Sequence, residues 1–118
     1  MGKIKFVDLK YQYQILQVRI NKAIQKVLNH GQYIQGSEVF ELEVKLATYS
    51  GTKYCVSCSS GTDALLMSLM AQGIGPGNAV FTTPFTFIAT AEVIQLLGAT
   101  PIFVDIVDDT FNIDSSKL

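Results

Sequence analysis

The order of its segments constrains the fold of this chain most. Short apolar runs rich in β-branched and aromatic residues lie at 54–58 ("YCVSC"), 79–85 ("AVFTTPF") and 101–106 ("PIFVDI"). Stretches with helical character separate them, at residues 62–71 and 88–97. Strands that alternate with helices of this length are typical of βαβ crossovers, which place the strands in parallel. The sequence therefore predicts the α/β class, with an incomplete, mainly parallel sheet and flanking helices.

Two helices are expected before the first of these runs. Apolar residues recur at helical spacing from Leu9 to His30, and Gly31 follows as a stop. A second helix is expected to have Ser37 as its cap and to end at Gly51. The helix at 62–71 is apolar nearly all round, which predicts a buried helix.

These elements divide the chain into a helical amino-terminal segment (residues 1–52) and a βαβαβ portion (residues 53–118). Three parallel strands make a poor finished sheet. The last residues, "NIDSSKL" (112–118), look like the cap and first turn of a helix that does not continue. Residues 1–118 are therefore expected to be part of a larger domain that is cut short.

Composition excludes two classes of partner. Lys and Arg number 9 against 10 Asp and Glu, a formal net charge of -1, so there is no basic field to hold a nucleic acid. Apolar residues make up 48% of the chain, but no run approaches the roughly 20 apolar residues of a membrane span. The amino end has no long apolar core and is not expected to be a signal peptide. We expect a cytoplasmic protein with neither nucleic acid nor membrane as partner.

Cys55 and Cys58 form a C-x-x-C pattern, which is found in zinc sites and in redox pairs. Zinc usually takes four ligands, and the only histidine, His30, lies in another element. A redox pair normally begins a helix, whereas these thiols lie in an alternating, strand-like run. The pattern therefore favours buried, reduced cysteines and no metal site.

Ser60, Gly61 and Thr62 open the apolar helix that follows. The first backbone N–H groups of a helix lack partners and carry a partial positive charge, so a small, hydroxyl-bearing start can bind an anion such as a phosphate. The same residue types are also ordinary helix caps that need no ligand. The residues alone leave both interpretations open.

Five segments resemble one family in order and spacing. They are "FVDLKYQY", "GQYIQGSEVFELE", "SSGTDALLMSLMAQGIGPGN", "TTPFTFIATAEVI" and "GATPIFVDI". Together they look like the amino-terminal part of the DegT/DnrJ/EryC1/StrS family of sugar aminotransferases. The resemblance implies a type I pyridoxal-phosphate fold, of which this chain would form the amino-terminal part of the large domain. It also implies a homodimer and transfer of an amino group, usually from glutamate, to a nucleotide-linked keto sugar, as in surface-polysaccharide or amino-sugar biosynthesis.

The resemblance also assigns residues to the cofactor pyridoxal 5'-phosphate. The turn Ser60, Gly61 and Thr62 would hold its phosphate through backbone amides and the Thr62 hydroxyl, with Gly61 allowing close approach. Phe87 matches the aromatic residue that stacks on the pyridine ring, although its position also suits a core aromatic. Tyr33 is a weaker candidate for the substrate entrance or the partner subunit, and a packed loop tyrosine is an equal alternative.

The chemistry of the family needs two further groups, a lysine that forms a Schiff base with the cofactor and a carboxylate that keeps the pyridine nitrogen protonated. In the family both lie downstream of this region, so no catalytic residue is assigned here and the chain alone is expected to be inactive. Some relatives are dehydratases with histidine in place of the lysine. The alternative function is a non-catalytic remnant, or a phosphate-binding module on a βαβ scaffold.

Overall fold

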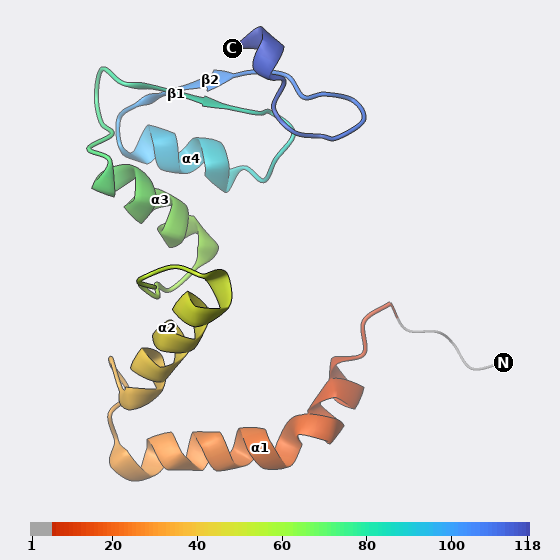
Figure 1. Ribbon diagram of the computed structural model, residues 1–118, viewed down its shortest axis with the longest axis vertical. Coiled ribbons are helices and arrows are strands. Elements are labelled where there is room, and N and C mark those ends of the chain that lie inside the picture. The colour runs from red at the N-terminus through yellow and green to blue at the C-terminus, as the bar shows by residue number, and fades with distance from the viewer. Residues whose placement is uncertain (1–5) are drawn as a thin grey trace, which may run out of the picture. The chain divides into compact units, whose positions relative to one another are not determined.

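The computed structural model describes residues 6–118 and divides the chain into two compact units, residues 1–57 and 58–118 (Figure 1). Within residues 6–57 the first unit holds two helices, and the second unit holds the sheet. Each unit is described below by itself.

The first unit consists of helix α1 (Leu9–His30) and helix α2 (Ser37–Ser50). The predicted bounds of α1 are confirmed, and Gly31 ends the helix with a φ of 70°. The predicted cap of α2 is wrong by one residue. Gly36 has the extended backbone of a cap, while Ser37 is already helical and its hydroxyl donates to the Glu38 carboxylate.

An ionic cluster joins α1 to the start of α2. The Glu38 carboxylate lies 2.9 Å from Lys26 Nζ and 3.2 Å from His30 Nε2. The hydrogen bond from Lys26 is the largest of the causes that lower the pKa of Glu38 to about 2. Because Glu38 also lies in the first turn of α2, its charge is favoured by the helix dipole.

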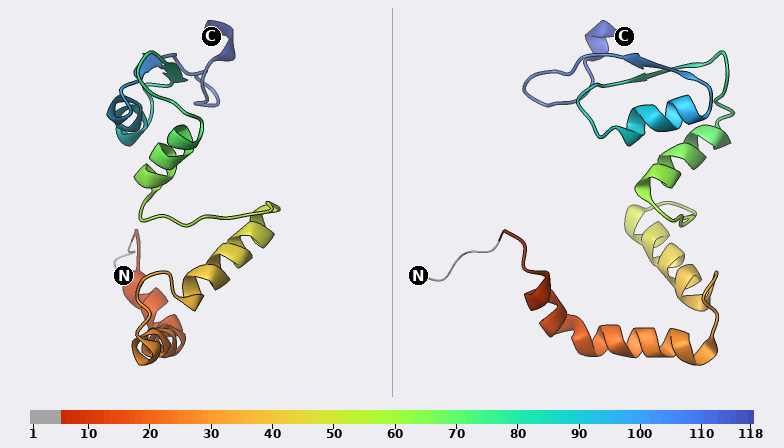
Figure 2. Two further views of the ribbon diagram at one scale, coloured as in Figure 1. Left: turned by 90° about the vertical axis from the view of Figure 1, so that its left-hand side faces the viewer. Right: turned by 180° about the vertical axis from the view of Figure 1, so that it is seen from behind.

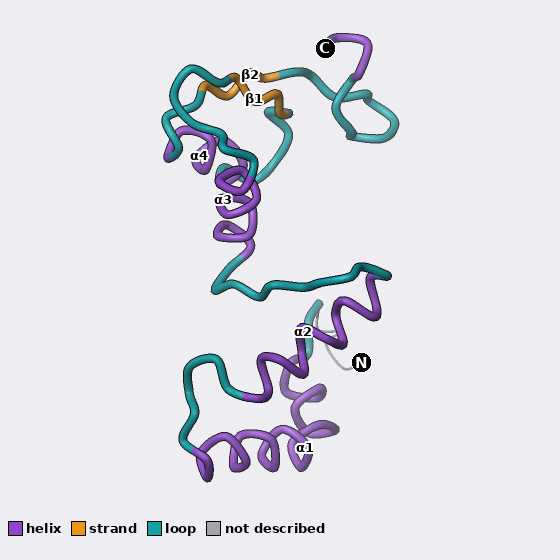
Figure 3. Tube along the Cα trace, turned by 60° about the vertical axis from the view of Figure 1, so that its left-hand side comes forward, coloured by secondary structure: helices purple, strands orange, loops and turns teal. Residues whose placement is uncertain are grey.

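The strand predicted at residues 54–58 does not form. This stretch belongs to the loop between α2 and α3, drawn in teal in Figure 3. A strand is stabilised by the ladder to its neighbour, and among residues 6–118 only β1 and β2 pair. Glu43 of α2 holds the stretch instead, because its carboxylate accepts hydrogen bonds from both the backbone N–H and the hydroxyl of Ser57, each at 2.8 Å.

The second unit runs in the order α3 (Gly61–Ala71), β1 (Ala79–Thr82), α4 (Ala89–Leu96), β2 (Thr100–Phe103) and the short 3-10 helix η1 (Ser115–Lys117). β1 and β2 pair in parallel. Helix α4 covers one face of this pair, and α3 packs against α4 (Figures 1 and 2). The α/β class and the incomplete parallel sheet with flanking helices are thus confirmed.

The core lies between α4 and its neighbours. Val93, Ile94 and Ala99 form its buried centre. Partly buried apolar residues surround them, namely Leu66, Leu69, Ile74 and Val80. After α4 the chain turns at Gly98, where φ is 74° and an added Cβ would lie 3.0 Å from Pro76 Cγ. The turn into β2 therefore requires glycine on two counts.

The prediction that the third helix is buried is wrong for this chain. No residue of α3 is fully buried, and Leu65, Met67 and Met70 are 43%, 47% and 57% exposed. A helix that is apolar on all sides needs cover on several sides, whereas in the described part of the chain only α4 packs extensively against it.

The chain ends in a closed loop and a single helical turn. Ile106 and Ile113 form an antiparallel bridge after β2. Asp114 then caps η1 by accepting the N–H of Ser116 at 3.0 Å, so the predicted cap and first turn are present as a 3-10 turn. None of the helices within residues 6–118 combines the length and the apolar character that crossing a bilayer requires.

Candidate functional site

The start of α3 is built by a serine–aspartate pair. Ser60 has extended backbone angles, and its hydroxyl oxygen accepts the N–H of Asp63 at 3.1 Å. The same hydroxyl donates to the Asp63 carboxylate at 2.9 Å, and so does the hydroxyl of Ser59. The hydrogen bond from Ser59, followed by that from Ser60, lowers the pKa of Asp63. Ser60 is therefore the helix cap, and its side chain is fully engaged.

Three donors at this helix end remain available. The backbone N–H groups of Gly61 and Thr62 and the Thr62 hydroxyl donate to no acceptor among residues 6–118. An added Cβ at Gly61 would meet no atom within 4 Å, so a ligand can reach the backbone there. Unpaired donors at the positive end of an eleven-residue helix can favour an anion.

A hollow of about 440 Å³ lies beside this helix start, between α3 and α4. Its lining residues are Thr62, Glu92, Gln95 and Leu96. Glu92 is the ionisable member of this set and carries a carboxylate, so the hollow itself does not favour a phosphate. The amide end of α3 is therefore the candidate anion site, and the hollow adjoins it on the Thr62 side.

Phe87 lies in the loop between β1 and α4, directly before Ile88, the cap residue of the helix. Its carbonyl accepts the N–H of Thr90 at 3.1 Å, which ties its backbone to the first turn of α4. The side chain is 75% exposed, so within residues 6–118 the ring does not belong to the core. Phe87 thus presents an open aromatic face from a fixed backbone position.

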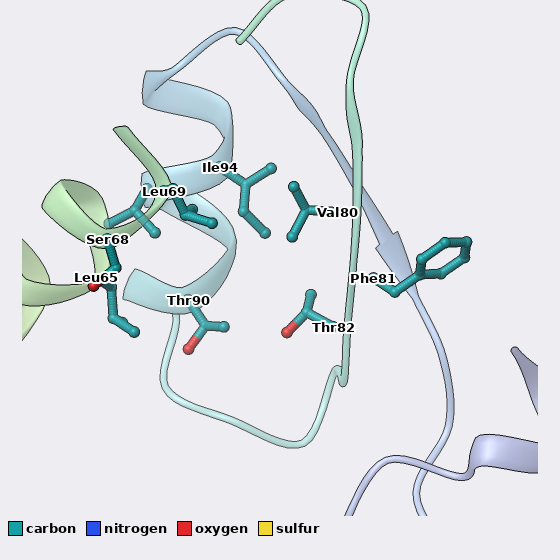
Figure 4. A pocket seen from close by; sticks show the side chains of 9 residues that line it. Leu65, Ser68, Leu69, Val80, Phe81, Thr82, Thr90 and Ile94 are labelled. Carbon is teal, nitrogen blue, oxygen red and sulfur yellow. The ribbon is translucent and has the colours of Figure 1, made fainter. Parts of the chain in front are cut away.

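A second cavity, of about 160 Å³, lies where α3 and α4 approach β1 (Figure 4). Leu69, Val80 and Ile94 point toward it, whereas Phe81 points away from it. Its lining is mainly apolar. We regard it as space in the packing of the core and assign no ligand to it.

Of the other predicted positions, Cys58 adjoins the start of α3, where its thiol donates to the Ser60 carbonyl at 3.2 Å. Tyr33 belongs to the first unit, in the loop between α1 and α2, and its side chain is 68% exposed. It is therefore not a packed loop residue among those described. Cys55 and Cys58 are free, but Cys55 is only partly buried and Cys58 is exposed, so the prediction of buried thiols is wrong. No group of potential metal ligands occurs within residues 6–118.

Asp63 and Ser59 are the site residues that the sequence reasoning missed. The spacing of Ser60 and Asp63 is that of a capping box, in which the third helical residue bonds back to the cap. This pattern was sufficient to predict which side chain caps the helix and which donors remain for a ligand.

Known proteins resemble this chain over nearly all of its length. The model of the DegT/DnrJ/EryC1/StrS aminotransferase family matches residues 14–118. A UDP-2-acetamido-2-deoxy-3-oxo-D-glucuronate aminotransferase from Pseudomonas aeruginosa is 53% identical over 115 residues, which are 98% of this chain and 32% of the relative.

Solved structures of the same family also match this chain. The crystal structure of a DegT DnrJ EryC1 StrS aminotransferase from Brucella abortus matches with a TM-score of 0.90 and 50% identity, over 95% of this chain and 30% of that one. NtdA from Bacillus subtilis, solved with bound cofactor PMP, matches with a TM-score of 0.89 and 33% identity, over 100% of this chain and 27% of that one. The chain spans about a third of the length of such relatives. It belongs to the DegT/DnrJ/EryC1/StrS aminotransferase family.

Proposed function

We propose that this chain is the amino-terminal part of a pyridoxal-phosphate-dependent aminotransferase that acts on a nucleotide-linked keto sugar, with glutamate as the amino donor. The observation that carries the proposal is the start of α3. Two amides and one hydroxyl there donate to no acceptor within residues 6–118, in a family whose members include a structure with bound PMP. A cofactor phosphate suits these donors in charge and in number.

Different residues at the helix start shape the turn and bind the phosphate. Ser60 shapes the turn, because its hydroxyl is engaged with Asp63. Gly61 and Thr62 supply the donors. The phosphate then lies at the end of a helix dipole and anchors the cofactor, while the Asp63 carboxylate remains occupied by serine hydroxyls.

Phe87 is proposed to stack on the pyridine ring. It follows β1, and the loops that follow parallel strands leave the same edge of the sheet, where ligands of α/β proteins usually bind (Figure 1). The backbone of Phe87 is fixed and its ring is exposed, so the ring can stack on a planar ligand and leave the site open to solvent. When bound, the cofactor supplies an electron sink for amino transfer, and these residues hold and orient it.

The remaining assignments extend the same proposal. The complete enzyme would be a cytoplasmic homodimer, with Tyr33 near the substrate entrance or the partner subunit. Residues 1–52 would form its helical amino-terminal segment and residues 53–118 a βαβαβ portion of the large domain. Residues 54–58 keep the composition of a strand, and they would pair if a longer protein supplied the neighbouring strand.

A chimera tests the proposal. Residues 1–118 replace the matching segment of the Pseudomonas aeruginosa relative, and the purified chimera is loaded with pyridoxal phosphate. We expect it to retain one cofactor per chain. It should also form the amino sugar from UDP-2-acetamido-2-deoxy-3-oxo-D-glucuronate and glutamate. The relative itself is the positive control.

The chimera must first match the relative in melting temperature and oligomeric state. A chimera that folds in this way but fails to retain the cofactor contradicts the proposed phosphate site. One that retains the cofactor but transfers no amino group contradicts the proposed activity. A chimera that binds inorganic phosphate but not pyridoxal phosphate favours the simpler phosphate-binding module.

A further inference from the structure

We propose that Phe111 is a positioning residue that fixes the cofactor-facing loop through its contact with Phe85. The rings of Phe85 and Phe111 stack with centroids 5.5 Å apart and planes inclined by 29°. Phe85 lies two residues before Phe87 in the loop between β1 and α4. The inference therefore rests on the proposed function, in which Phe87 stacks on the cofactor.

The stack joins two loops that leave the same edge of the sheet. β1 and β2 are parallel, so the loop that follows β1 and the loop that follows β2 both start at their carboxyl ends (Figure 1). Phe85 belongs to the first of these loops and Phe111 to the second. The two aromatic rings are thus a direct contact between the loop that carries Phe87 and the chain after β2.

The loop after β2 is held in one conformation. Its ends are closed by the Ile106–Ile113 bridge and by the bond from Val107 N–H to the Asn112 carbonyl at 2.9 Å. The N–H of Phe111 donates to the Val107 carbonyl at 2.8 Å. These hydrogen bonds in the loop therefore fix the position of Phe111.

Phe111 occupies a backbone conformation that its residue type disfavours. Its φ is 57°, and bulky residues rarely adopt the left-handed region because their Cβ crowds the backbone. A glycine or asparagine would occupy this position with less strain. A phenylalanine at such a position indicates that its ring has a role that offsets the strain.

That role is not burial. The side chains of Phe85 and Phe111 are 63% and 58% exposed, so their stack contributes little to the core. The stack does fix the middle of the loop between β1 and α4, whose two ends are held by hydrogen bonds. Before it, the Phe85 N–H donates to Thr83 Oγ1 at 3.1 Å, and after it the Phe87 carbonyl accepts the Thr90 N–H. The stack thus restricts the segment that carries the Phe87 ring.

The experiment compares two substitutions of Phe111 in the chimera described above. Phe111→Asn removes the ring but suits the positive φ, so the fold should be kept. Phe111→Tyr keeps the ring and is the conservative control. Phe87→Ala reports on the proposed cofactor contact itself.

Three quantities are measured for each variant: the melting temperature of the cofactor-free protein, the dissociation constant of pyridoxal phosphate, and the visible circular dichroism of the bound cofactor. We expect Phe111→Asn to melt at the same temperature as the parent or higher. Loss of an aromatic pair should weaken cofactor binding about 2- to 12-fold. The circular dichroism band should fall, because the cofactor ring is held less uniquely, and Phe111→Tyr should behave as the parent.

A double substitution separates positioning from a general effect. If Phe111 acts through Phe87, Phe111→Asn should weaken binding no further once Phe87 is alanine. Fully additive losses would overturn the inference, and so would a lower melting temperature that accounts for the loss of cofactor.

The inference and the proposed function fail in different ways. An effect of Phe87→Ala with none of Phe111→Asn overturns the positioning role and leaves the proposed site intact. No effect of Phe87→Ala on binding or circular dichroism contradicts the proposed stacking site, and the positioning role with it.

Discussion

Thr62→Val separates the two interpretations of the α3 helix start. The substitution keeps the shape of the side chain and removes its hydroxyl. That hydroxyl donates to no acceptor within residues 6–118, and Ser60 is the residue that caps the helix. If the hydroxyl holds a phosphate, its removal costs a hydrogen bond to a charged group, about 1.5–3 kcal/mol. Cofactor binding should then weaken roughly 10- to 150-fold.

The free energy of unfolding should depend on Ser60 and hardly on Thr62. Thr62→Val breaks no hydrogen bond between described residues and exchanges residues of similar helix propensity, so unfolding should change by no more than about 0.5 kcal/mol. Ser60→Ala is the matched control. It removes the oxygen that accepts the Asp63 N–H, so it should destabilise the protein by about 1 kcal/mol. Its effect on cofactor binding should be smaller than that of Thr62→Val.

The assay is a cofactor titration followed by absorbance, beside denaturation curves of the cofactor-free chimera and its two variants. If Thr62→Val lowers stability and leaves the dissociation constant unchanged, the hydroxyl has a structural role and the phosphate assignment is refuted. If Ser60→Ala lowers affinity as much as Thr62→Val at unchanged stability, our division between cap and donors is wrong.

Three further expectations follow from the geometry. Gly98→Ala should destabilise the chimera by more than about 1 kcal/mol, because φ is positive at this position and the new Cβ would lie 3.0 Å from Pro76. Denaturation curves measure this, and an unchanged midpoint would contradict it. The pKa of Glu38 is lowered to about 2, so its carboxylate stabilises the fold at pH values above its unfolded-state pKa, and this contribution is lost as the pH falls toward 2. Glu38→Gln should therefore weaken the dependence of unfolding free energy on pH in the acid range. An unchanged pH dependence would contradict this. Pyridoxal phosphate and borohydride should label several lysines of the 118-residue chain unselectively, whereas one stoichiometric adduct in a peptide map would show that the chain holds the catalytic lysine after all.

Local patterns predicted the helices well because the signals that end them are local. Helical periodicity and a glycine stop gave the bounds of α1, and Gly98 turns the chain after α4 as expected. The failures depend on partners distant in sequence. Residues 54–58 have the composition of a strand but no neighbour within residues 6–118, and Cys58 stays exposed with them. The apolar surface of α3 predicted burial, but burial depends on what covers the helix.

The candidate site divides in the same way. The free donors of Gly61 and Thr62 follow from residue types and their place at a helix start, so the sequence was enough to nominate them as a candidate anion site. The role of Asp63 was also readable from its spacing to Ser60. The contact between Phe85 and Phe111 was not, because it depends on two loops meeting at one edge of the sheet and on a positive φ that phenylalanine rarely adopts.

A crystal structure of the cofactor-loaded chimera tests the central claim most directly. We expect the cofactor phosphate at the amino end of α3, with its oxygens about 2.7–3.2 Å from the backbone nitrogens of Gly61 and Thr62 and from Thr62 Oγ1. The Phe87 ring should stack on the pyridine. A phosphate held elsewhere, with these three donors bonded to water, would contradict the assignment of this helix start as the cofactor anchor.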